Sequence, residues 1–185
     1  MLKRNNLAFY LREDKLLDEV DGDGNSGGLS SVFALRTPVT STGVSTEEIL
    51  AQAVIPAGAV IDGSMISALI NLEKTGGTVN TGTIRIRLGK TGTTADPLVV
   101  QAALATTTVT LAYRTDVQVF SDGFRQAGLN TAVVTTPGAS ASALASKQTV
   151  AGMLSGPTYL TITSQFGAAV AERAAISVFD ISVRV

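Results

Sequence analysis

The residue types that most often perform catalysis are scarce in this chain. It contains no cysteine and no histidine, which excludes disulfides, thiolate metal sites and imidazole acid–base chemistry. Serine nucleophiles therefore lack a histidine base, and the adjacent residues Ser146 and Lys147 would point to opposite faces of a strand. Nothing beyond residue type marks Asp116 and Asp122 as a pair for glycoside cleavage. We expect a protein that is not an enzyme, with no catalytic residue and no cofactor.

One acidic segment imitates the start of a calcium-binding loop. Asp21, Asp23 and Asn25 occupy its first, third and fifth positions. The sixth and twelfth positions, which require Gly and Glu, are Ser26 and Val32. We interpret the segment as a flexible acidic linker, so no metal ligand is expected.

A second segment, Gly89-Lys90-Thr91, resembles the end of a phosphate-binding loop. The motif requires a glycine five residues before Gly89, and the chain has Ile84 there. An alternating strand precedes the segment and no helix follows it, so no helix N-terminus is available to hold phosphate. The sequence therefore predicts a hairpin turn.

The surface of the protein is predicted to carry little charge. Asp, Glu, Lys and Arg make up 16% of the 185 residues, against about 25% in a typical soluble domain. The net charge of −1 argues against a nucleic-acid partner, because such binding needs a basic face. Stable interfaces exclude charge from their cores. The composition thus favours an oligomer or assembly subunit over a monomer with a hydroxyl-rich surface.

The first 25 residues of the chain carry far more charge than the rest. Residues 1–25 contain four basic and six acidic side chains, whereas residues 126–171 contain only Lys147. A glycine-rich segment, residues 21–28, ends this charged region. We predict an N-terminal arm and linker over residues 1–30 and a β-sandwich domain over residues 31–185. The arm, helical or extended, is expected to order on a partner through its apolar side chains, which are Leu7, Phe9, Tyr10, Leu11, Leu16 and Leu17.

No targeting or membrane-spanning segment is expected. Charged side chains interrupt the first fifteen residues, so they contain no apolar run of signal-peptide length. Nowhere does an apolar run approach the roughly 18 residues that a spanning helix needs. We expect a protein that is made in the cytoplasm and stays soluble until it assembles.

The body of the chain alternates between apolar and polar residues, as half-buried strands do. Val, Ile and Thr dominate these runs, which suits a pleated surface. Thr161 and Thr163 are expected to point outward. The side chains expected to point inward are Ile66, Ala68, Ile70, Leu72, Ile84, Ile86, Leu88, Val109, Leu111, Tyr113, Leu160 and Ile162.

The alternation of apolar and polar residues at the end of the chain predicts a strand that contains a β-bulge. The phase of its alternation changes by one residue at Phe179–Asp180, which is what a bulge does. Its inward side chains are predicted to be Ile176, Val178, Ile181, Val183 and Val185.

Turn signals separate the strands at short spacing, which is typical of an antiparallel sandwich or barrel. Short helices are considered at residues 47–53, where a strand fits equally well, and at residues 147–154. Residues 139–146 are low in complexity and are predicted to form a surface loop. The fold class is thus all-β, an antiparallel β-sandwich. The turn signals include Pro56-Ala-Gly58, Asp62-Gly63, Gly76-Gly77, Gly89-Lys-Thr-Gly92, Asp122-Gly123 and Gly156-Pro157.

Arg85 and Arg87 lie on the polar side of one predicted strand. Two interpretations stay equally open. The pair belongs to a solvated face that protects a sheet edge, or it binds acidic residues of a neighbouring subunit.

One stretch of the body resembles a known group of proteins. Residues 54–72 read VIPAGAVIDGSMISALINL, and residues 77–89 read GTVNTGTIRIRLG. An Ile-Pro-Ala-Gly turn leads into a strand, then into a Gly/Thr-rich loop and a second strand. Over roughly residues 50–90, this order resembles small virion proteins of tailed bacteriophages. The resemblance implies a jelly-roll or related sandwich, usually oligomeric and often trimeric, and it carries no catalytic residue.

Within that group we expect a capsid decoration or cement protein on the surface of the phage head. It would bind and stabilise the shell of the major capsid protein as a homotrimer, with neither nucleic acid nor membrane as a partner. The alternative is a tail or fibre component that binds a host receptor. A carbohydrate-binding module or hydrolase domain is less favoured. A small icosahedral capsid subunit would need a basic arm, which residues 1–25 do not supply.

Overall fold

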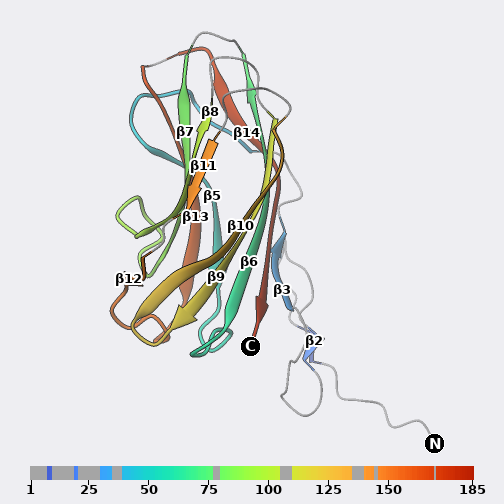
Figure 1. Cartoon of the computed structure of the whole chain (residues 1–185), viewed down its shortest axis with the longest axis vertical. Helices are drawn as coiled ribbons and strands as arrows, with labels where there is room; N and C mark the ends of the chain where they lie inside the picture. The colour runs from blue at the N-terminus through green and yellow to red at the C-terminus, as the bar shows by residue number, and fades with distance from the viewer. Residues whose placement is uncertain are drawn as a thin grey trace, which may run out of the picture.

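The computed structural model describes residues 8–9, 19–20, 30–34, 39–76, 80–104, 110–134, 140–143, 146–168 and 170–185. All regular secondary structure within these ranges is β-strand, and most of the strands form a two-layered body (Figure 1). The predicted arm residues Leu7, Tyr10, Leu11, Leu16 and Leu17 lie outside the described residues, and so does the predicted linker 21–28. Phe9 belongs to a short strand.

Two antiparallel sheets make up the body. The seven-stranded sheet runs in the order β12 (Gln148–Thr149), β10 (Gly123–Val134), β9 (Thr110–Phe120), β6 (Met65–Thr75), β14 (Arg173–Arg184) and β3 (Ser30–Ala34), with β4 (Val39–Thr40) also paired to β14. The five-stranded sheet runs in the order β11 (Ser140–Ala143), β8 (Leu98–Leu104), β7 (Gly82–Gly89), β13 (Thr158–Phe166) and β5 (Glu48–Ile55). The predicted all-β antiparallel sandwich is therefore confirmed.

The path of the chain between the sheets is that of a jelly roll. Four strands of the larger sheet follow the order β3-β14-β6-β9, and four of the smaller sheet follow β5-β13-β7-β8. In both sheets a late strand lies between two early ones, which is the result of two interlocked Greek keys. Strands β10, β11 and β12 extend this eight-stranded frame at one side.

Near the N-terminus lies a separate pair of short strands. Residues Ala8–Phe9 (β1) pair with Glu19–Val20 (β2) and form a two-stranded sheet of their own. Figure 1 shows β2 beyond the end of β3, away from the two layers of the body. The division of the chain at residue 30 stays a prediction.

The core consists of the inward rows of both sheets, largely as the alternation predicts. Each buried aliphatic side chain stabilises the fold by about 1.5–3 kcal/mol relative to its exposure. Val109 lies outside the described residues, as do the side chains of Leu111 and Tyr113. The inward positions confirmed as buried are Ile66, Ala68, Ile70, Leu72, Ile84, Ile86, Leu88, Leu160 and Ile162.

Strand β13 is buried on both of its faces. Thr161 and Thr163 lie in register with the outward residues of β7, as predicted, yet both are fully buried. Thr163 donates a hydrogen bond to Glu47, and Gln52 lies over Thr161. Side chains from flanking segments thus cover this central strand, which strand alternation alone does not reveal.

The bulge in β14 exists but lies earlier than predicted. The register between β14 and β6 shifts between Ile176 and Val178. As a result Phe179 is fully buried, and Val178, predicted to point inward, is only half-buried. The ring of Phe179 packs against that of Phe33, with centroids 5.1 Å apart. Burying this large ring stabilises the fold more than burying Val178 would, so the alternation changes phase before Val178.

The last residues of the chain are predicted correctly except for the final one. Ile181 and Val183 are buried in the core. Val185 lies beyond the end of β14 and is 46% exposed, so its predicted inward orientation is wrong. The pairing of β14 with β6 ends at Arg184, so no neighbouring strand covers the residue after it.

The structure contains strands at two places where a short helix was considered and at one place where a loop was predicted. Residues 48–55 form β5, the strand alternative, and residues 147–154 form β12 followed by turns. Gly152 has a positive φ of 64°, which interrupts any helix there. Part of the predicted surface loop, Ser140–Ala143, is β11, because the free edge of β8 offers its backbone a hydrogen-bonding partner.

Candidate partner-binding face

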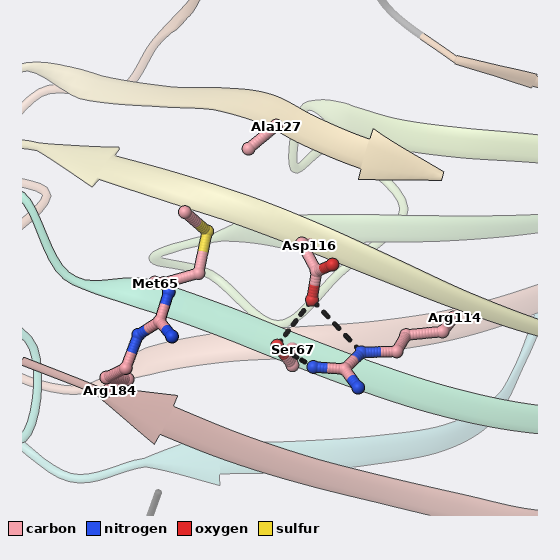
Figure 2. Close-up of a pocket in the computed structure, with 6 residues that line it drawn as sticks. All are labelled: Met65, Ser67, Arg114, Asp116, Ala127 and Arg184. Carbon is pink, nitrogen blue, oxygen red and sulfur yellow. Dashed lines mark hydrogen bonds and ion pairs between the residues drawn. The ribbon is translucent and has the colours of Figure 1, made fainter. Parts of the chain in front are cut away.

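The outer face of the seven-stranded sheet contains a shallow hollow. Its volume is about 340 Å³. Four neighbouring strands contribute to it, namely β14, β6, β9 and β10 (Figure 2). The lining residues are Met65, Ser67, Arg114, Asp116, Ala127 and Arg184.

A small polar network forms the floor of this hollow. Ser67 in β6 lies directly opposite Asp116 in β9, and its hydroxyl donates a hydrogen bond to that carboxylate. Arg114 donates from Nε to Asp116 Oδ1 at 3.2 Å and from Nη2 to Ser67 Oγ at 3.1 Å. Figure 2 shows the three side chains converging between β6 and β9. Residues two apart on a strand share a face, so the spacing of Arg114 and Asp116 itself creates this ion pair.

A bulge in β10 shapes the wall of the hollow. The register between β10 and β9 shifts between Gln126 and Gly128, so Ala127 has no direct partner. Gly128 lies opposite Asp116, and a Cβ added to this glycine would come within 3.4 Å of the carboxylate. The backbone of Gly128 thus lies close beside the carboxylate of Asp116.

The same face exposes a large apolar side chain between charged ones. Leu69 lies in the middle of β6 and is 43% exposed. Its cross-strand neighbours are Arg114 in β9 and Asp180 in β14. The side chain of Arg114 is 52% exposed despite its ion pair, and Arg184 forms no ion pair with any described residue. An exposed leucine beside an accessible arginine is typical of protein interfaces, where Arg is enriched.

The outer face of the five-stranded sheet is built differently. Glu47 pairs with Arg87, with Nε 2.9 Å from Oε1, and with Arg85 at 3.5 Å. Arg85 also donates hydrogen bonds to Gln101 and Gln165, both at 3.0 Å. Both arginines are thus bound within their own chain, which neither of the two sequence interpretations foresaw.

The pKa of Glu47 reflects this environment. Burial by itself would raise that pKa, but the hydrogen bonds from Arg87 and Thr163 and the positive charges of Arg87 and Arg85 lower it further than burial raises it. The pKa of Glu47 therefore lies below its ordinary value, and the carboxylate stays ionised at neutral pH. Arg85 and Arg87 on this face are paired within the chain, whereas the side chain of Arg114 beside Leu69 is 52% exposed.

The other residues weighed for chemistry do not assemble into a reactive site. Asp116 pairs with Arg114, whereas Asp122 pairs with Lys147 at 2.5 Å. The hydrogen bond and charge of Lys147 lower the pKa of Asp122. Ser146 is exposed beside Lys147. Among the described residues, no cluster of Asp and Glu side chains could hold a metal ion.

The segment that resembles a phosphate loop is a hairpin connection, as predicted. It joins β7 to β8, which pair antiparallel. The buried carboxylate of Asp96 accepts hydrogen bonds from the backbone NH groups of Thr91 and Gly92, at 3.1 and 2.7 Å, and from the Thr91 hydroxyl at 2.8 Å. Asp96 thus fills the place where a phosphate would have to bind.

Of the residues that line the hollow, sequence reasoning considered only Asp116, and only as a pair with Asp122 that nothing beyond residue type supported. The available signal was Leu69, a large apolar residue on the polar side of a strand that otherwise alternates cleanly. The predicted arm residues give no comparison, because their side chains lie outside the described part of the chain.

Comparisons with known proteins leave the chain without a family. No protein-family model matches it, and no curated protein does. A solved structure of the CBM2 module of the evolved Dit of Lactobacillus casei BL23 phage J-1 is similar to it, with 12% identity, a TM-score of 0.35 and coverage of 72% of this chain and 69% of that one. The binding domain of botulinum neurotoxin serotype C1 is 7% identical, with a TM-score of 0.35 and coverage of 97% and 48%.

A third similar structure is that of the infectious bursal disease virus Gx strain, with 13% identity, a TM-score of 0.26 and coverage of 100% and 42%. The chain spans less than half the length of the neurotoxin and bursal virus chains. At these TM-scores the similarities assign no function. No helix in the described residues is long and apolar enough to cross a membrane.

Proposed function

We propose that this chain is a structural protein of a bacteriophage particle, a decoration or cement protein that binds the major capsid protein on the head. The observation that carries the proposal is the face around Leu69. It combines an exposed leucine, a half-exposed Arg114 and an Arg184 without an ion-pair partner among the described residues. Such a face suits a partner surface that is apolar with acidic side chains around it.

The strand order adds support at the level of architecture. Jelly rolls occur in viral capsid proteins and also in lectins, so the fold alone does not choose a function. The segment that resembles phage virion proteins forms the expected order of turn, strand and second strand. Its turn is closed by a hydrogen bond from Ala59 N to Pro56 O at 3.2 Å, and β6 and β7 follow.

The predicted arm fits this proposal geometrically. Strand β3 is an edge strand of the sheet that carries the Leu69 face, and the chain enters the body through it. An arm before Ser30 would start at the rim of the proposed contact surface. A segment that orders on a partner can add contact area without enlarging the core.

A tail or fibre component is the second candidate. The same sheet face would then bind a tail protein, or a receptor on the host. The exposed arginines favour an acidic protein partner in either location. They do not distinguish head from tail, so the binding experiment must include both parts of the particle.

The test compares two matched substitutions in a binding assay with phage heads that lack this protein and, separately, with isolated tails. Leu69→Asp places a charge on the proposed contact face. Ile49→Asp is the control, since Ile49 is 46% exposed and lies on β5 of the other sheet. We expect Leu69→Asp to weaken head binding at least about tenfold, which is about 1.4 kcal/mol, while Ile49→Asp binds normally. Equal binding by all three proteins would refute the assigned face, and binding to tails alone would refute the capsid assignment.

A further inference from the structure

Three polar side chains gather inside one end of the sandwich, away from the Leu69 face. Lys74 is the penultimate residue of β6 and is fully buried. Glu172 directly precedes β14 and is 4% exposed. Asn80 lies shortly before β7 and is half-buried. A lysine is almost never fully buried without a specific reason.

Asn80 contacts both of the other residues. Lys74 Nζ donates to the backbone oxygen of Asn80 at 2.5 Å. Asn80 donates twice to Glu172, from its backbone N to Oε1 and from its side-chain Nδ2 to Oε2, both at 3.0 Å. The charge of Glu172 also acts directly on Lys74. The amine of Lys74 thus contacts the backbone of Asn80, and the side-chain amide of the same residue contacts the carboxylate of Glu172.

The backbone holds Glu172 firmly in this group. A Cβ added to Gly76, whose φ is +85°, would meet Ala171 O at 2.6 Å. On the other side, a Cβ added to Gly43 would meet Glu172 O at 2.5 Å. The segment that carries Glu172 is therefore packed closely between two glycine turns, which limits its freedom to move away from Lys74 and Asn80.

This environment makes the amine of Lys74 easier to deprotonate than that of an exposed lysine. Burial lowers the pKa of Lys74, although the charge of Glu172 opposes the shift. Desolvated lysines are effective nucleophiles towards carbonyl carbons. A proton passed from Lys74 to Glu172 would replace two buried charges with two neutral groups, which is favourable in a low-dielectric interior.

We propose that Lys74 and Asn80 join through a side-chain amide bond that the protein forms by itself, with Glu172 carrying the protons. Nζ of Lys74 attacks Cγ of Asn80, the new Nζ–Cγ bond forms and the Cγ–Nδ2 bond breaks. Of the two protons that Nζ loses, one converts the leaving nitrogen to ammonia and the other leaves with it as ammonium. Glu172 ends as the carboxylate. No oxidant, reductant or further reactant is consumed.

The bond would lock the place where the chain crosses between the sheets. Lys74 ends a strand of the larger sheet, and Asn80 precedes the next strand, which belongs to the smaller sheet. The reaction would occur once per chain and is independent of the proposed role in a phage particle. It would stabilise the sandwich by restricting its unfolded state, as other cross-links do.

The test is the intact mass of the purified full-length chain, followed by peptide mapping. We expect a mass below that of the sequence by one ammonia molecule, and a branched peptide that joins residues 74 and 80. Lys74→Met and Glu172→Gln should restore the mass of their sequences, whereas the control Lys90→Met should keep the loss. Lys90 is a suitable control because it is also partly buried and donates to Gly156 O at 2.9 Å.

Two results would overturn the proposal. One is an unmodified wild-type mass after prolonged incubation of the folded protein. The other is a loss of ammonia that persists in Lys74→Met, because cyclisation of an asparagine onto its own backbone gives that loss without a lysine. The first result is read on the wild-type protein alone, so it does not depend on how well any variant folds. Peptide mapping of Lys74→Met decides the second, because it shows whether the remaining loss lies at Asn80 itself.

Discussion

Leu69 of β6 lies directly across from Arg114 of β9 on the outer face of the seven-stranded sheet, and both side chains are about half exposed. On the opposite face of the sandwich, Arg85 and Arg87 share Glu47 and lie mostly covered. The two outer faces therefore differ in what they offer to another molecule. The guanidinium group of Arg114 beside Leu69 is accessible, whereas those of Arg85 and Arg87 on the other face are paired with Glu47 and mostly covered.

A charged side chain at a central core position is predicted to unfold the protein. Ile86→Asp should unfold the body, because an unpaired charge at this fully buried position costs several kcal/mol. Thermal unfolding followed by circular dichroism checks the effect. Ile49→Asp, the same substitution at a 46% exposed position, should leave the melting temperature nearly unchanged. A stable Ile86→Asp protein would contradict the assigned orientation of β7.

Glu47 is predicted to stabilise the fold in a pH-dependent way. Its pKa is lower in the folded protein than in the unfolded chain, so its contribution is complete above the unfolded-state pKa and is lost as the pH falls through the folded-state pKa. Glu47→Gln should lower the free energy of unfolding by about 1–3 kcal/mol at neutral pH, because two arginines lose their carboxylate. The difference from wild type should shrink in acid.

Denaturant titrations at several pH values measure this difference. The exposed Glu73 provides the control, since Glu73→Gln should change stability little at any pH. A Glu47→Gln penalty that stays constant down to strongly acidic pH would show that the ion pairs with Arg85 and Arg87 are not its cause.

The N-terminal arm is predicted to serve binding and not folding. Removing residues 1–28 leaves β3 and both sheets intact, so the truncated protein should fold and keep its oligomeric state. It should no longer bind phage heads. Co-sedimentation with heads tests this, and normal decoration by the truncated protein would show that the arm has no such role.

The oligomeric state is predicted to be a homotrimer. Native mass spectrometry of the full-length chain should give three times the mass of one chain across a range of concentrations. The low charge content of the sequence favours an oligomer, and the resemblance of residues 50–90 to small phage virion proteins implies that it is a trimer. A monomer at all accessible concentrations would contradict it.

Sequence patterns predicted the core better than the surface. The alternation around Ile86 and Ile70 has one physical cause, burial of one side of a strand, and it translated directly into buried rows. The bulge in β14 lies earlier than its predicted position at Phe179–Asp180. Its position depends on the packing of the Phe179 ring against Phe33, a residue distant in sequence. Arg85 and Arg87 illustrate the general limit, since their partner Glu47 lies about 40 residues away.

The candidate face depends even more on tertiary structure. Ser67 and Asp116 are 49 residues apart in sequence, and only the pairing of β6 with β9 brings them together. The same holds for Lys74 and Glu172, which meet because β6 pairs with β14. A single sequence offers no signal for these pairings, because each of these residues alone is an ordinary polar position on a strand or turn.

The most direct test of the central claim is a reconstruction of the phage particle by cryo-electron microscopy, fitted with this sandwich. We expect density for the chain on the outer surface of the head, in a copy number comparable to that of the major capsid protein, with the Leu69 face against the shell. Density for the chain confined to the tail, or a head-bound sandwich whose Leu69 face points into solvent, would contradict it.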